Sequence, residues 1–246
     1  MAGTQRSRRP REGKRPEAPG GEGVGTPQSE AAGAVFELPT PIAEGGLPLW
    51  QVLASRRSVR HYGSRPMTTA ALSQLLWSTH GVTGRSGARE LRNAPSAGAC
   101  YPIDAYVVVN NVKGLDPGLY RFIPDDHALM LIRAGDVGAE VAKAALGQTM
   151  CKQASVTLLW TAVLPRTTGR YGERGHRYVF LDAGHVGQNT YLAATALGLG
   201  CCTIGAFDDE AMDRVVGADG TVETTVYGAS VGPSIEDRQP PGRRIR

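Results

Sequence analysis

The sequence lacks several features that would define its class at once. No stretch approaches the roughly 20 consecutive apolar residues that a membrane-spanning helix needs. No Gly-x-Gly-x-x-Gly follows the first predicted strand, so a Rossmann dinucleotide site is not indicated. Aromatic residues make up only 6% of the 246 residues, and no basic stripe with interleaved aromatics is visible. These absences argue against a membrane protein, a Rossmann dehydrogenase and a nucleic-acid-binding protein.

Cysteine and histidine are also sparse. The chain has four cysteines, at Cys100, Cys151, Cys201 and Cys202. None forms a Cys-x-x-Cys pair, which argues against a zinc site or a disulfide framework. We therefore expect buried, reduced thiols in a cytoplasmic protein. The five histidines are isolated, and His176 and His185 are too far apart for a helical metal pair. We expect His185 to join Asp182, Gln188 and Asn189 in a polar network at an interface rather than to take part in catalysis.

The net charge of +4 is concentrated at the two ends, in RSRRPREGKR near the start and GRRIR at the finish. Residues 1 to about 34 nearly lack large apolar side chains and cannot bury enough surface to offset their ordering entropy. We therefore expect a disordered basic tail and an extended lead-in over residues 1–45, followed by one domain over residues 46–246. A basic tail can tether partners, although a solubilising extension explains the composition more simply.

From Leu47 the apolar residues recur at regular spacings. They predict helices at 47–57, 68–81, 137–146, 175–198 and 208–216. They predict strands at 106–109, 119–122, 129–132, 156–163, 201–205 and 224–231, with a long polar loop at 82–99. The continuous apolar run at 156–163 is typical of a central strand that is covered on both faces. Because helices and strands alternate only in part, the pattern favours an α+β sandwich over a doubly wound sheet.

Three segments have residues suited to binding a ligand. The first, Ser55-Arg56-Arg57-Ser58-Val59-Arg60, can donate many hydrogen bonds to one anion, because guanidinium groups match phosphate oxygens. A solvated helix end explains this segment equally well on its own. The second is Pro95-Ser96-Ala97-Gly98, whose small residues allow close approach of a flat ligand. The third is GLGCCTIGAFDD, at residues 198–209, where the backbone N–H groups of Gly205 and Ala206 are predicted to face a ligand edge. The second and third segments are also consistent with ordinary turns.

The order RRSVR, PSAG, a long helix and GLGCCTIGAFDD resembles the FMN-dependent nitroreductase superfamily. Within it, SAGACYP and DAGHVGQNTYLAATALGLG resemble the SagB-type dehydrogenases, which oxidise azolines in peptide natural products. The resemblance covers roughly residues 47–246. It implies a mainly antiparallel central sheet flanked by helices, and an intertwined homodimer with two FMN sites at the interface.

The resemblance also implies roles for individual residues. It assigns the phosphate and the pyrimidine side of the flavin to Arg56, Arg57, Ser58 and Arg60. A loop from the other subunit supplies Pro95, Ser96, Ala97 and Gly98. Gly205 and Ala206 present backbone amides near flavin N5 and O4. Arg243 or Arg244 completes the phosphate site. Thr203 replaces the more usual proline, a change that we expect to be harmless.

One departure affects the catalytic groups. The azoline dehydrogenases resemble each other in a Lys-Tyr pair, whereas this chain has Arg170 followed by Tyr171. Arginine stays protonated and cannot serve as a general base, but it can stabilise developing negative charge. Tyr171 remains available as an acid or base. Tyr101 is equally consistent with the substrate side of the flavin and with a core or interface position.

The sequence thus predicts an FMN-dependent oxidoreductase that transfers hydride through flavin N5. Its expected substrate is a peptide or small natural product, as for a SagB-type dehydrogenase. The first alternative is an NAD(P)H-dependent nitro or quinone reductase. The second is a non-catalytic flavin-binding scaffold. We expect no membrane and no nucleic-acid partner.

Overall fold

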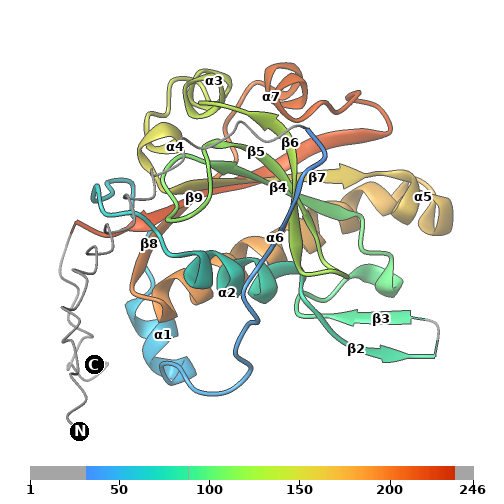
Figure 1. Cartoon of the computed structure of the whole chain (residues 1–246). Coiled ribbons are helices and arrows are strands. Elements are labelled where there is room, and N and C mark those ends of the chain that lie inside the picture. Colours follow the sequence, from blue (N-terminus) through green and yellow to red (C-terminus); the bar gives the residue numbers. More distant parts are fainter. Residues whose placement is uncertain (1–31, 88, 236–246) are drawn as a thin grey trace, which may run out of the picture.

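A computed structural model describes residues 32–87 and 89–235 of the chain (Figure 1). Most of the predicted tail, residues 1–31, therefore lies outside the described residues, as do Arg243 and Arg244. The described part of the lead-in contributes a short strand, β1 (Val35–Glu37), which pairs with β6 (Ala128–Ala134). Folded structure in the described residues thus begins upstream of Leu47.

Seven strands of the described chain form one sheet in the order β1-β6-β5-β4-β7-β9-β8, and every named pair is antiparallel. The remaining strands are β4 (Ile103–Val109), β5 (Gly118–Ile123), β7 (Val156–Val163), β8 (Leu199–Ile204) and β9 (Glu223–Pro233). The prediction of a central strand at 156–163 is confirmed, because β7 lies between β4 and β9 and is buried along nearly its whole length. This α+β architecture also agrees with the predicted fold class.

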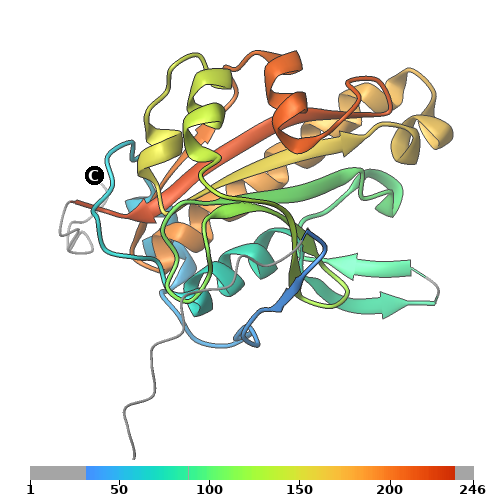
Figure 2. The same cartoon turned by 45° about the horizontal axis from the view of Figure 1, so that its top comes forward.

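Helices cover both faces of the sheet (Figure 2). On one face lie α2 (Thr69–His80) and α6 (Arg174–Ala196), whose buried side chains share a core with Trp160 of β7. The other face is covered by α3 (Gly138–Ala144), α4 (Met150–Gln153) and α7 (Asp209–Val216). The short α1 (Leu49–Ser55) lies beside the C-terminal part of α6. The long helix therefore forms a core element that touches several of the predicted motifs.

Capping residues fix the ends of two helices where the sequence predicts them. The Thr68 side chain accepts a hydrogen bond from the Ala71 N–H at the start of α2, and Asp208 does the same for Ala211 in α7. Gly217 ends α7 with a left-handed φ of 80°. The Asp208 cap fixes the start of α7 directly after the turn that contains Gly205 and Ala206.

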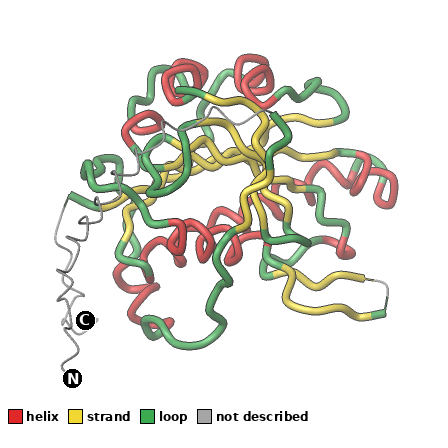
Figure 3. The backbone as a smooth tube through the Cα atoms, in the orientation of Figure 1, coloured by secondary structure: helices red, strands yellow, loops and turns green. Residues whose placement is uncertain are grey.

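The segment predicted as a polar loop at 82–99 contains a projecting hairpin (Figure 3). Its strands are β2 (Val82–Ser86) and β3 (Arg89–Arg92), which pair only with each other. The prediction of a loop was wrong here because the hairpin has little alternation of apolar side chains and is mostly polar. A further helix, α5 (Pro165–Tyr171), was also not predicted and follows β7 directly.

All four cysteines lie within the described residues and none forms a disulfide. Cys151, Cys201 and Cys202 are buried, whereas Cys100 is half-buried. Across residues 32–87 and 89–235, no helix is both long and apolar enough to cross a membrane.

Candidate functional site

The first and third predicted segments meet at the edge of the sheet. The Val59 N–H donates to the Cys201 carbonyl at 2.8 Å, and Ser58 forms an isolated parallel bridge with Cys201 of β8. The arginine-rich segment therefore continues the sheet beyond β8 for a short distance. Backbone pairing, which leaves little trace in a sequence, thus brings two distant motifs together.

Tyr191 of α6 ties this edge to the long helix. Its hydroxyl lies 2.8 Å from the Ser58 hydroxyl and accepts a hydrogen bond from the Thr203 N–H at 3.1 Å. The guanidinium carbon of Arg56 lies 5.0 Å from the centre of the Tyr191 ring. Proline at position 203 has no N–H and could not hold Tyr191 in this way. Sequence reasoning did not identify Tyr191, because its position on α6 matches an ordinary core stripe.

The arginines of the first segment have different surroundings. Arg57 donates to the carbonyls of Ala54 and Arg56, at 3.2 Å and 2.7 Å, and so satisfies groups at the end of α1. Arg60 is exposed and forms no ion pair with any carboxylate in the described residues. Arg56 and Arg60 therefore retain donors for an anion, whereas Arg57 uses some of its own for the helix end.

The second segment is held by a carboxylate on α6. Ser96 donates its hydroxyl hydrogen to Asp182 Oδ2 at 2.5 Å, and the Ala97 N–H donates to Asp182 Oδ1 at 3.2 Å. Ser96 Oγ in turn accepts from the Tyr101 N–H at 2.9 Å. Burial raises the pKa of Asp182, and its hydrogen bonds with Ser96 and Ala97 oppose this rise only in part. We refer to residues 95–101 as the PSAG loop.

The PSAG loop has an unusual backbone conformation. Gly98, Ala99 and Tyr101 all have a positive φ, of 60°, 53° and 44°. Such values are unfavourable for residues with a Cβ and persist where surrounding contacts enforce them. Two arginines of α5 bind carbonyls of this loop: Arg170 donates to Gly98 at 3.0 Å and Arg166 to Tyr101 at 3.3 Å. Helix α5, which the sequence did not predict, therefore holds the PSAG loop in place.

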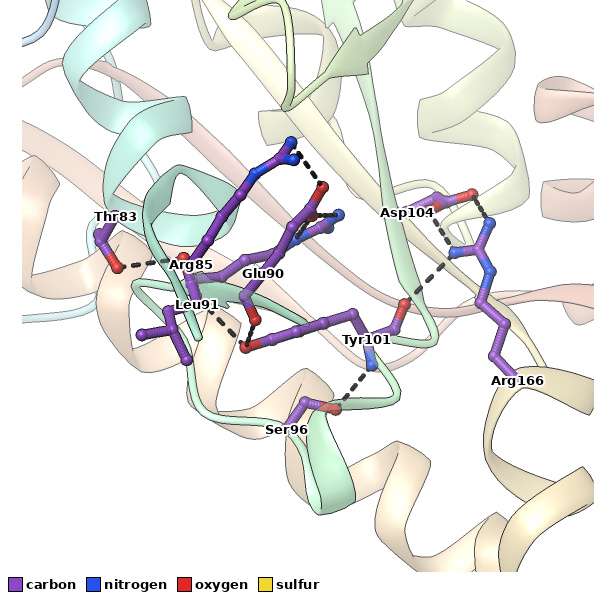
Figure 4. A network of polar contacts seen from close by, with 9 residues as sticks. Thr83, Arg85, Glu90, Leu91, Ser96, Tyr101, Asp104 and Arg166 are labelled. Carbon is purple, nitrogen blue, oxygen red and sulfur yellow. Dashed lines mark hydrogen bonds and ion pairs between the residues drawn. The ribbon is translucent and has the colours of Figure 1, made fainter. Parts of the chain in front are cut away.

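Figure 4 shows how Arg166 is itself fixed. Its guanidinium group binds both carboxylate oxygens of Asp104, at 2.6 Å and 3.1 Å, and Arg121 binds the same carboxylate at 2.7 Å. Burial alone would raise the pKa of Asp104, but the two arginines outweigh it and lower the pKa. Asp104 thus stays charged and anchors α5 to the start of β4.

Tyr101 joins the PSAG loop to the β2–β3 hairpin, as Figure 4 also shows. Its hydroxyl donates to the Glu90 carbonyl at 3.1 Å and accepts from the Arg92 N–H at 3.3 Å. The Arg92 guanidinium carbon lies 4.9 Å from the centre of the ring. Within this chain Tyr101 therefore anchors the hairpin, and its place relative to the flavin stays a prediction.

The two predicted catalytic residues lie against the PSAG loop. A side chain at position 98 would overlap the Tyr171 hydroxyl and crowd the Arg170 guanidinium, and φ is positive there, so glycine is favoured. Arg170 lies over the Tyr171 ring at 5.3 Å, and the Tyr171 ring meets that of Tyr178 edge to face at 5.0 Å. The structure thus places Arg170 and Tyr171 beside Gly98 of the PSAG loop, and their catalytic role stays a prediction.

The third segment leaves two amides available. Gly205 and Ala206 are exposed, and no hydrogen bond within the described loops and turns uses either backbone N–H. The Ala206 carbonyl accepts from the Gln148 side chain at 2.7 Å, which fixes the orientation of this turn. These amides are free to donate to a ligand edge.

Helix α6 separates the two halves of the predicted site. Asp182, which holds the PSAG loop, and Tyr191, which holds the arginine segment, are nine residues apart. At the rise of an α-helix this spacing corresponds to about 13 Å. Within one chain the PSAG loop and the arginine segment therefore lie apart, along the same helix.

The remaining sequence expectations fare differently. Asp182 and Asn189 bind groups in the same chain, whereas His185 and Gln188 are exposed on the single chain, so the network at an interface stays a prediction. No cluster of potential metal ligands occurs in the described part of the chain. A cleft of about 400 Å³ lies between α1, α2, α6 and residues 42–47, and its walls include none of the predicted site residues.

Comparisons with known proteins identify the family of this chain. Residues 53–232 match the model of the nitroreductase family, and the chain belongs to this family of oxidoreductases. Family members typically bind FMN.

Particular relatives refine the comparison. The chain is 43% identical to MJ1384 of Methanocaldococcus jannaschii, which carries the nitroreductase name, over 75% of this chain and 91% of that protein. It is 28% identical to the trifolitoxin-processing protein TfxB of Rhizobium leguminosarum bv. trifolii, over 66% of this chain and 45% of TfxB. A crystal structure of a nitroreductase-named protein from Ralstonia eutropha JMP134 superposes with a TM-score of 0.70 at 27% identity, covering 82% of this chain and 90% of that one.

Proposed function

We propose that this protein is an FMN-dependent oxidoreductase whose flavin takes up and gives up hydride at N5. The observation that carries the proposal is the pairing of the arginine segment with β8. This pairing brings arginine side chains to the same edge of the sheet as two exposed amides. Arg56 and Arg60 fit the phosphate of FMN, because their guanidinium groups retain free donors. Gly205 and Ala206 fit the edge of the ring system, because their amides are exposed.

The second half of the site is proposed to come from a partner subunit. Because about 13 Å of α6 separates the PSAG loop from the arginine segment, we infer that each flavin takes its PSAG loop from the other chain. The exposed side chains of α1 and α6 support this inference: Trp50 is 78% exposed, Phe180 is 62% exposed and Leu181 is 55% exposed. Large apolar residues so exposed on neighbouring helices are typical of an interface.

Arg170 and Tyr171 are proposed to act on the substrate. The Arg170 guanidinium can stabilise negative charge as it develops, and the Tyr171 hydroxyl can donate or accept a proton. Their contact with Gly98 of the PSAG loop supports this role. The similarity to TfxB, a processing protein by name, supports a SagB-type dehydrogenase that acts on a peptide or small natural product.

A nitro or quinone reductase that uses NAD(P)H is the second candidate. One observation favours it, the 43% identity to MJ1384, whereas Arg170 in place of the expected lysine favours neither candidate. Anaerobic mixing separates the candidates. Rapid bleaching of the flavin by NADH or NADPH supports the reductase, whereas reduction by an azoline-containing peptide and not by NAD(P)H supports the dehydrogenase.

The cofactor assignment is tested by the visible absorption spectrum of the purified protein and by mass identification of the released cofactor. FMN at about one per chain is expected. The double variant R56A/R60A is expected to lose FMN while its far-ultraviolet circular dichroism stays unchanged. Arg57→Ala is the matched control and is expected to retain more FMN than the double variant, because Arg57 uses its donors on α1. Full FMN occupancy in the double variant would refute the phosphate assignment.

A further inference from the structure

Basic side chains gather at the turn between α5 and α6, although the described part of the chain is electrically balanced. Residues 32–235 contain seventeen basic and seventeen acidic residues. Yet residues 166–177, around the turn between α5 and α6, contain a single acidic residue, Glu173, and several arginines. These arginines are Arg166, Arg170, Arg174 and Arg177. The positive field at this turn is therefore local and does not follow from the overall composition.

Most of this charge has no counter-charge in the described chain. Arg166 is neutralised by Asp104. No carboxylate of the described residues lies within ion-pair distance of Arg170, Arg174 or Arg177. Arg170 gives one hydrogen bond to the Gly98 carbonyl, which leaves most of its donors free. Three guanidinium groups are thus available to bind an anion.

Two of these arginines lie over an aromatic pair. Arg170 lies 5.3 Å from the centre of the Tyr171 ring, and Arg174 lies 5.9 Å from the centre of the Tyr178 ring. The two rings are 5.0 Å apart and nearly perpendicular. Ring contacts restrict the rotamers of a long side chain, so less conformational entropy is lost when an anion binds. These contacts link the four side chains Arg170, Tyr171, Arg174 and Tyr178, which we name the Arg–Tyr cluster.

The Arg–Tyr cluster borders the PSAG loop, because Arg170 binds Gly98 and Tyr171 occupies the space that a side chain at position 98 would need. We propose that this cluster is a subsite for a carboxylate carried by the substrate, with Arg174 as the residue that binds it and Arg170 between it and the PSAG loop. The guanidinium groups supply the charge, and the tyrosine rings supply apolar contact with the organic group that bears the carboxylate. The proposal rests on the proposed function in one respect, namely that the substrate reacts at the neighbouring flavin site.

Binding can be measured without the reaction. Isothermal titration calorimetry of the purified full-length protein, with and without FMN, uses benzoate, its neutral isostere benzamide, and inorganic phosphate. Benzoate is expected to bind at least tenfold more tightly than benzamide and phosphate. Arg174→Gln is expected to weaken benzoate binding about fivefold, whereas Arg214→Gln, an exposed arginine paired only with Glu210 in α7, is expected to have no effect. Equal binding of benzoate and benzamide, phosphate binding as tight as benzoate binding, or indifference to Arg174→Gln would overturn the proposal.

The source of the carboxylate is distinguished by a second ligand, a short peptide with a single glutamate. Tighter binding of the peptide than of its glutamine counterpart, again lost in Arg174→Gln, identifies a peptide carboxylate. Preference for benzoate alone identifies a small organic acid. If neither carboxylate ligand binds more tightly than its neutral counterpart, the subsite does not exist.

Activity gives an independent readout. In FMN-loaded protein, the ratio of kcat/KM for 4-nitrobenzoate to that for 4-nitrobenzamide is expected to fall about tenfold in Arg174→Gln and to stay unchanged in Arg214→Gln. Protein that binds benzoate but never FMN refutes the proposed function and leaves the subsite intact. Protein that is active with FMN but shows no preference for the carboxylate refutes the subsite alone.

Discussion

Ser96 of the PSAG loop and Asp182 of α6 are joined by a hydrogen bond of 2.5 Å between Oγ and Oδ2. The same carboxylate accepts from the Ala97 N–H. The position of the loop is therefore set by the long helix, across 86 residues of sequence.

Replacing Asp182 by alanine removes this carboxylate and leaves two donors of the loop without their acceptor. We expect the free energy of unfolding to fall by about 1–3 kcal/mol. Urea denaturation measures the change. The matched control is Asp126→Asn, on an exposed turn, which is expected to alter stability by less than about 0.5 kcal/mol. Equal effects of the two substitutions would show that the loop does not depend on Asp182.

The pH dependence of stability offers a separate test of the same residue. Burial raises the pKa of Asp182, so the folded state holds this proton more tightly than the unfolded state does. Its contribution to stability is therefore complete below about pH 4, the usual value for aspartate, and decreases as the pH rises through the folded pKa. Asp182→Asn is expected to remove this decrease. Parallel stability curves for the two proteins from pH 3.5 to 7 would contradict the prediction.

His80 has the opposite dependence on pH. Thr79 donates its hydroxyl hydrogen to the Leu76 carbonyl and so accepts from His80 Nδ1, while no described residue reaches Nε2. Burial is the main cause that lowers the pKa of His80 from 6.5 to about 4. The neutral ring is therefore favoured in the folded state, and stability is lost as the pH falls from 6.5 towards 4, by about 3 kcal/mol in all.

The variant His80→Leu is expected to lack this loss. Guanidinium denaturation between pH 4 and 7 compares it with the wild type, and the exposed His176→Gln serves as the control. A variant whose stability declines with acid as steeply as that of the wild type would exclude His80 as the responsible group.

Gly98 is a position where one methyl group should disturb the catalytic residues. It has a left-handed φ of 60°, and an added Cβ would overlap the Tyr171 hydroxyl. We expect Gly98→Ala to cost about 1–3 kcal/mol of stability and to lower kcat more than FMN binding. Gly169→Ala in α5 is the control, because no atom lies within 4 Å of its added Cβ. Unchanged turnover in Gly98→Ala would show that Tyr171 has no part in the reaction.

The proposed subunit interface predicts a change of mass in solution. Leu181 is 55% exposed on α6. Leu181→Glu should therefore leave the fold of one chain intact but place charges between two chains. Light scattering after gel filtration is expected to show a dimer for the wild type and a monomer for the variant, with loss of bound FMN. Val222→Glu, at a position 50% exposed and outside α1 and α6, is expected to remain dimeric.

The sequence predicted the elements whose residues form long apolar patterns. The strand at 156–163 and the helix at 175–198 were located almost completely, because the strand is apolar throughout and the helix has an apolar stripe at helical spacing. The strand predicted at 106–109 in fact begins at Ile103. The prediction began too late because Asp104 interrupts the apolar run. Its charge is tolerated there only because Arg166 and Arg121 neutralise it, and such a partnership between distant residues is not visible in a local pattern.

The candidate site was likewise predicted only in part. The three motifs were found from their residue types, but the residues that hold them were missed. Tyr191 looks like a core residue of a helix, and Arg166 lies in α5, whose threonines and glycine are weak helix formers. The hairpin at 82–92 escaped prediction because its polar strands are anchored by Tyr101 rather than by an apolar face.

Helix α6 fixes both the distance and the relative direction of the Asp182 and Tyr191 side chains. Each residue inserted into or deleted from an α-helix rotates the following residues by about 100° and shifts them by about 1.5 Å. A single insertion between these residues would therefore aim one of the two side chains away from its partner. The length of this stretch is consequently not free to vary while the two halves of the site keep their spacing, whereas the hairpin and the loops after α3 can lengthen without altering it. Surface segments of the molecule can thus change in length while the spacing between Asp182 and Tyr191 is preserved.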